Sequence, residues 1–81
     1  MAESDVSAGV YQNYLKDTGG LIKELALDAK KRATTKDTDF SDGYLSGFHR
    51  VVSLMQQQAE AFGITLEDIG LEGIDADVDL T

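Results

Sequence analysis

The chain has 81 residues, no cysteine, and a net charge of −8 from fifteen acidic and seven basic residues. A chain of this length forms one small domain, and the lack of cysteine excludes disulfides and cysteine-based zinc sites. The excess of acids disfavours DNA or RNA as a direct partner, because phosphate binding depends on lysine and arginine.

The charge is unevenly distributed along the chain. Residues 51–81 carry seven acidic residues and no basic one, whereas residues 1–50 carry eight acidic and seven basic residues. No stretch approaches the roughly 18 consecutive apolar residues that a membrane span needs, and the acidic start has no apolar signal-peptide core. We therefore expect a soluble, cytoplasmic protein that does not bind a membrane.

The first predicted element is a helix over about residues 8–33. Its apolar positions follow a spacing of 4-3-4-3-4, which is typical of a heptad seam: Tyr11, Leu15, Thr18, Ile22, Leu25 and Ala29. Gly19 and Gly20 interrupt this helix, and each costs about 1 kcal/mol relative to alanine. Because the heptad phase is unbroken across the pair, we predict one helix that is kinked or weakened there.

The second predicted element is a helix over about residues 41–62. The same spacing recurs along it: Tyr44, Phe48, Val51, Met55, Gln58 and Phe62. Asp39 or Ser41 can cap its N-terminus, and Gly63 can cap its C-terminus in the left-handed conformation. The short connection between the two helices predicts an antiparallel hairpin.

The rest of the chain is shorter and more acidic. We divide the chain into a helical hairpin domain, residues 1–64, and a short helix with an acidic tail, residues 65–81. Thr65 can cap the short third helix. The alternating apolar residues from Ile74 to Leu80 are compatible with a short strand or an extended arm, and we expect a mobile acidic C-terminal arm.

A single hairpin leaves part of its apolar seam uncovered. The all-α fold that solves this is a homodimer of two antiparallel hairpins in a four-helix bundle. Its expected packing interface comprises Tyr11, Leu15, Ile22, Leu25, Tyr44, Phe48, Val51, Met55, Gln58 and Phe62. Gln58 is the polar member, and we hypothesise that it bonds to Tyr14 and fixes the register. The alternative is a glutamine exposed at the edge of the stripe.

No pattern supports catalysis or metal binding. Ser46, His49 and Ser53 share one helical face, but the sequence supplies no orienting acid or oxyanion hole, so we interpret them as a solvated surface. The acids of residues 37–43 begin like a calcium loop, but the glycine is displaced and the glutamate is missing. We expect no catalytic residue, no cofactor and no metal.

The expected function is therefore non-catalytic protein–protein binding, with self-association through the hairpin. The acidic half suggests a basic protein partner, which would meet a surface formed by Glu60, Glu67, Asp68, Glu72, Asp75, Asp77 and Asp79. The acidic arm could instead dock on Lys16, Lys23 and Lys30, which recur every seven residues, across a dimer. The alternative function is stoichiometric inhibition of a basic or nucleic-acid-binding protein, of immunity, antitoxin or DNA-mimic type.

Overall fold

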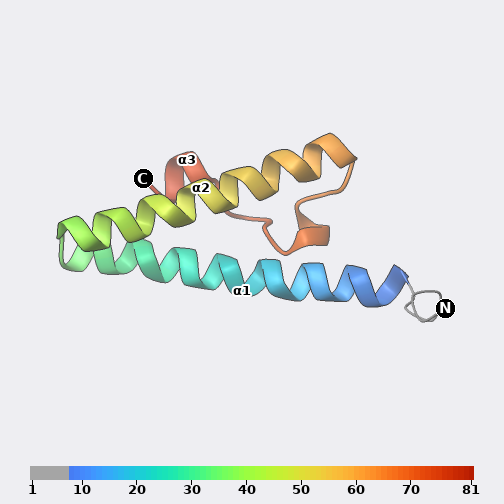
Figure 1. The fold of residues 1–81 in the computed structure, drawn as a ribbon, viewed down its shortest axis with the longest axis horizontal. Helices are drawn as coiled ribbons and strands as arrows, with labels where there is room; N and C mark the ends of the chain where they lie inside the picture. The colour runs from blue at the N-terminus through green and yellow to red at the C-terminus, as the bar shows by residue number, and fades with distance from the viewer. Residues whose placement is uncertain (1–7) are drawn as a thin grey trace.

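The computed structural model describes residues 8–81, and it is an all-α hairpin (Figure 1). Helix α1 spans Ala8–Thr35 and helix α2 spans Asp39–Phe62. A 3-10 turn, η2 (Glu67–Ile69), and a short helix, α3 (Ala76–Asp79), follow. No strand occurs in the described residues. The predicted hairpin is confirmed, and each long helix extends two residues further towards the turn than the sequence pattern indicated.

The ends of α2 are set by side-chain and backbone caps. Thr38 is the N-cap, because its Oγ1 accepts from the Ser41 N–H at 3.1 Å while Ser41 Oγ accepts from the Thr38 N–H at 2.9 Å. The prediction of Asp39 or Ser41 as the cap is therefore wrong, since Ser41 is the reciprocal partner of a capping box. Gly63, at φ 71°, closes the helix as predicted, and the Ile64 N–H reaches the Ala59 carbonyl.

Helix α1 runs without interruption through Gly19 and Gly20. Gly19 is buried because the backbone of the chain after η2 lies directly against it. A Cβ added at Gly19 would lie 1.6 Å from the Ile69 carbonyl oxygen, and one added at Gly70 would lie 2.3 Å from the Lys16 carbonyl oxygen. The two glycines thus allow two backbones to touch, which repays the helix propensity lost at Gly19.

Residues 64–81, here called the C-terminal segment, form part of the core. Ile69, Leu71, Ile74, Ala76 and Leu80 are all buried. They share one core with the buried residues of the two long helices: Ala26 and Ala29 of α1 and Leu45, Val52 and Ala59 of α2. The prediction of a mobile arm is wrong, because burial of this apolar surface from water holds the segment in place.

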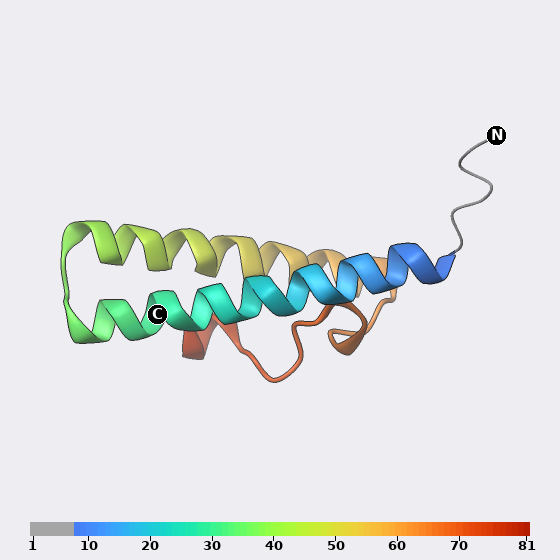
Figure 2. The ribbon, with the colours of Figure 1, turned by 90° about the horizontal axis from the view of Figure 1, so that it is seen from below.

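The C-terminal segment lies along one side of the hairpin only, as Figure 2 shows. Helix α1 donates to its backbone from Lys23, to the Glu72 carbonyl, and from Lys30, to the Thr81 carbonyl. Helix α2 donates from Gln56 Nε2 to the Ile74 carbonyl at 2.9 Å, and this contact is partly buried. Lys23 and Lys30 therefore bind the C-terminal segment of their own chain.

Candidate protein-interaction face

The side of the hairpin opposite the C-terminal segment carries large apolar side chains that remain exposed in the structure of residues 8–81. We call this the uncovered face, and it comprises Tyr11, Tyr14, Leu21 and Leu25 of α1 with Phe40, Tyr44, Val51, Leu54 and Phe62 of α2. All nine are exposed, from 39% for Tyr44 to 80% for Phe40. Many large apolar side chains exposed on one side of a fold are typical of a protein interface.

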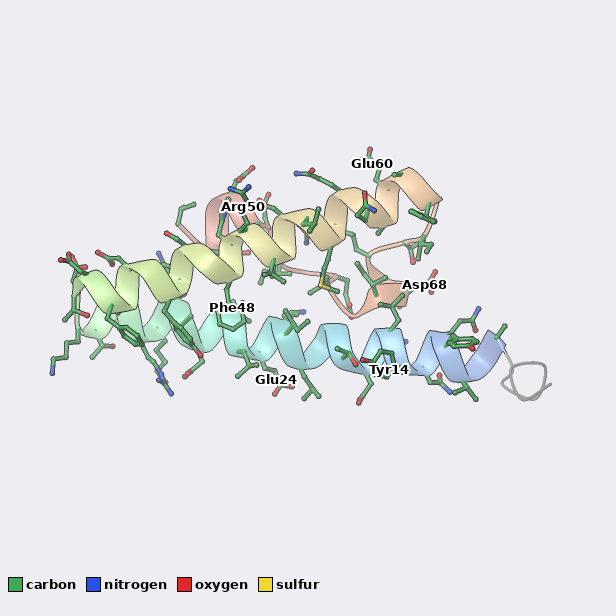
Figure 3. All side chains as sticks on the ribbon, viewed as in Figure 1. Tyr14, Glu24, Phe48, Arg50, Glu60 and Asp68 are labelled. Atoms are coloured by element: carbon green, nitrogen blue, oxygen red, sulfur yellow. The ribbon has the colours of Figure 1, made fainter. Side chains whose placement is uncertain are left out.

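Helical geometry places these residues away from the C-terminal segment. Each residue turns an α-helix by about 100°. On α1, Leu21 and Leu25 lie about 140–180° around the helix from Lys23 and Lys30, which contact the segment. On α2, the exposed apolar positions lie about 120–180° around the helix from His49 and Gln56, which contact the segment from that helix. Figure 3 shows Tyr14 on α1 and Phe48 between the two helices.

The predicted packing interface is divided between the core margin and the uncovered face. Leu15, Ile22, Phe48 and Met55 are partly buried against the core. The other apolar members lie exposed on the uncovered face: Tyr11, Leu25, Tyr44, Val51 and Phe62. Sequence reasoning left Leu54 and Phe40 out of the interface because they fall outside the 4-3-4-3-4 spacing, although both are strongly exposed.

Gln58 lies beside the uncovered face and is exposed. No hydrogen bond joins it to Tyr14, so the predicted bond within the hairpin is not formed in the described structure. The reason is that α1 and α2 diverge towards the end away from the turn (Figure 1), where Ile69 of the C-terminal segment also contributes to the core. An apolar groove of about 260 Å³ remains there, lined by residues that include Leu15, Met55 and Phe62.

The predicted acidic surface separates into two groups. The tail aspartates have partners within the chain: Asp75 Oδ1 accepts from the Asp77 N–H, Asp79 Oδ2 accepts from the Asp75 N–H, and Asp77 Oδ1 lies 3.0 Å from His49 Nε2. The remaining four acids, all exposed, make no side-chain hydrogen bond or ion pair within residues 8–81: Glu60, Glu67, Asp68 and Glu72. This second group can meet an external partner without giving up a contact within the described residues.

The polar residues considered for chemistry have structural surroundings. His49 lies at the surface and is partly buried, and its Nε2 is 3.0 Å from Asp77 Oδ1, a contact with the folded tail that the sequence pattern did not indicate. The calcium-like acids lie around the turn. There the pKa of Asp42 is raised because its protonated carboxyl donates a hydrogen bond to Asp37, with further contributions from desolvation and from the negative charges of Asp37 and Asp39. Residues 8–81 contain no group of three or more potential ligands arranged to hold a metal.

The uncovered face is the strongest candidate site in the described chain.

None of the helices within residues 8–81 combines the length and apolarity needed to cross a membrane. Comparison with models of known protein families, with curated proteins and with solved structures finds no match to this chain.

Proposed function

We propose that this chain is a non-catalytic binding protein that works through protein–protein contacts and self-associates through its uncovered face. The observation that carries the proposal is the uncovered face itself, with nine large apolar side chains exposed on one side of a folded hairpin. Burying a Leu, Val or Phe side chain contributes about 1.5–3 kcal/mol relative to leaving it in water. Closing this face against a partner therefore supplies a large driving force.

The size of the face suits a dimer. A helix of 24 residues, such as α2, is about 36 Å long. Two such helices packed at about 10 Å present a face of roughly 700 Å², close to the roughly 800 Å² that each partner contributes to a stable interface. Face-to-face packing of two hairpins would produce a four-helix bundle.

The first test is the solution mass across protein concentrations from micromolar to millimolar, measured by sedimentation velocity. The parent chain is expected to form a dimer. Leu54→Glu places a charge on the uncovered face at an exposed position and should give a monomer with an unchanged helical circular dichroism spectrum. Leu27→Glu is the matched control, because Leu27 is similarly exposed but lies outside the uncovered face. A parent chain that stays monomeric throughout would overturn self-association.

A second function is favoured by the free acids. Inhibition of a basic or nucleic-acid-binding protein would use four acids whose side chains have no partner within residues 8–81 and which are held by folded structure: Glu60, Glu67, Asp68 and Glu72. Rigid, clustered acids can compete for a basic pocket, whereas a mobile arm would bind more weakly.

The test is titration with a lysine-rich peptide by calorimetry at physiological ionic strength. Neutralising the four free acids to glutamine or asparagine should abolish the binding. Neutralising Asp17 and Glu24, exposed on α1, provides the control and should leave it intact. If the parent chain binds the peptide and both variants weaken this binding equally, the second function would be rejected.

A further inference from the structure

The turn end of the hairpin contains a groove that the chain leaves empty. It has a volume of about 460 Å³ and lies between the last turns of α1 and the first turns of α2, with no residue of the C-terminal segment in its lining. Its aromatic wall is formed by Phe40 and Tyr44, whose rings stack with centroids 6.0 Å apart. Phe40 is 80% exposed, so this wall offers apolar surface to an incoming side chain.

We propose that this groove receives Phe62 from a second copy of the chain, so that two hairpins pack with the turn end of each against the open end of the other. The open end comprises residues 8–18 and 55–68. This arrangement rests on the proposed self-association and adds the orientation of the two copies and the residue that enters the groove. Phe62 is suited to this role because it is 72% exposed in the last turn of α2.

The positions of the exposed residues along α2 support this orientation. A two-fold axis through Val51 places residue 40 of one copy opposite residue 62 of the other, and residue 44 opposite residue 58. Phe40 would therefore meet Phe62, and the Tyr44 hydroxyl would meet the Gln58 amide. All four side chains are exposed and lie on or beside the uncovered face. An isologous interface requires such self-complementarity.

The opposite orientation, with the two turn ends together, fits the surface less well. It would set the start of α2 against the end of α1 of the other copy. The exposed apolar residues of the uncovered face end at Leu25 on α1, and the next two turns present Asp28 and Arg32, joined by an ion pair at 2.8 Å. These two residues also line the groove, together with Phe40 and Tyr44, so what distinguishes the orientations is Phe62. With the turn ends together, Phe40 and Phe62, the two most exposed large apolar side chains of the described residues, would stay apart.

Charge favours the same choice. The turn end is balanced, with four basic residues (Lys30, Lys31, Arg32 and Lys36) against four acids (Asp28, Asp37, Asp39 and Asp42). Within its described residues the open end has one base, Lys16, against four acids: Asp17, Glu60, Glu67 and Asp68. Placing the two open ends together would bring like charges close, whereas turn end against open end separates them.

Orientation can be measured with one spin label on each copy, because the chain has no cysteine and a single introduced thiol labels uniquely. The site is Asp37→Cys, in the turn outside the groove lining. Pulsed dipolar spectroscopy should give a label separation near the length of the hairpin, about 36 Å or more for 24 helical residues. A separation well below that length would show turn ends together and overturn the arrangement while leaving self-association intact. A sample without dipolar coupling would be monomeric and would overturn both.

Contact between Phe40 and Phe62 is tested by a double-mutant cycle on the dimer dissociation constant. Within one chain the two residues are 22 positions apart on one helix, about 33 Å, so they cannot interact directly. If they meet between copies, Phe40→Ala and Phe62→Ala should each weaken dimerisation about tenfold or more, and the double variant should weaken it by less than the product. Val78→Ala, equally exposed but on the C-terminal segment, should have no effect. A multiplicative double variant would overturn the proposed contact.

Discussion

Gly19 has a reason to be glycine that its neighbour Gly20 lacks. The first lies against the Ile69 carbonyl, whereas a Cβ on the second would meet nothing within 4 Å. Substituting each glycine therefore measures two effects separately: helix propensity alone at Gly20, and helix propensity together with steric contact at Gly19. Within the described residues only the first position requires glycine, whereas the second lowers helix stability at a place that has room for a side chain.

Gly19→Ala should destabilise the folded chain by about 1–3 kcal/mol, because the methyl group forces the two backbones apart. Gly20→Ala should stabilise it by up to about 1 kcal/mol through helix propensity alone. Urea unfolding followed by circular dichroism, at one fixed protein concentration, measures both. Equal effects of the two substitutions would contradict the close backbone contact.

Asp42 gives a pH dependence at the turn. The hydrogen bond with Asp37, desolvation, and the charges of Asp37 and Asp39 raise its pKa above the ordinary 3.8. A raised pKa in the folded state contributes stability that is fully present below the unfolded value and is lost as pH rises through the folded value. Asp42→Asn cannot titrate, so its unfolding free energy does not fall in this way. The unfolding free energy of the variant relative to the parent should therefore increase as the pH rises from 3.8 through the raised pKa of Asp42.

Chemical unfolding at a series of pH values tests this difference. Asp17→Asn is the control, since no other acid lies three or four residues from Asp17 along α1. Its difference from the parent should vary less with pH. A constant difference for Asp42→Asn across the acidic range would show that the three turn carboxylates do not interact.

At the scale of elements, the C-terminal segment determines which side of the hairpin remains free. It supplies two of the three largest fully buried side chains, Leu71 and Leu80. Leu71→Ala should therefore destabilise the fold by about 2–5 kcal/mol. The milder Ile74→Val should lower the unfolding free energy by about 0.5–1.5 kcal/mol. It can still be measured if Leu71→Ala fails to fold.

Val78→Ala is the matched control for the segment, because Val78 is 70% exposed. It should change the unfolding free energy by less than about 0.5 kcal/mol. Thermal unfolding and urea unfolding are both suitable measurements. If Leu71→Ala behaved like Val78→Ala, the segment would not be packed in solution.

The two long helices could be predicted from sequence because their heptad spacing persists over several turns. The C-terminal segment could not, because the alternation of apolar residues from Ile74 to Leu80 is compatible with a strand, whereas Ala76–Asp79 form the short helix α3. Its burial depends on the space at Gly19 and on the amide of Gln56, which become visible only in three dimensions. The spacing also could not divide the apolar stripe between core and surface, since small residues such as Ala26 and Val52 occupy the core.

On the scale of the whole molecule, net charge opposes the association that the apolar face favours. Each copy carries a net charge of −8, so a dimer brings sixteen excess negative charges together. Exposed ion pairs between the copies would contribute only about 0–1 kcal/mol each. The long-range repulsion should therefore dominate the electrostatic part of the association.

Dimerisation should consequently strengthen as salt is added. The Debye length falls from about 30 Å at 0.01 M to about 8 Å at 0.15 M, so repulsion across a molecule of this size is largely screened over that range. Sedimentation equilibrium at several ionic strengths should give a dissociation constant that falls with salt. The double variant Glu60→Gln, Glu67→Gln removes two free acids from the open end and should show a shallower dependence. A dissociation constant that rises with salt would mean that attraction between opposite charges, rather than the apolar face, holds the copies together.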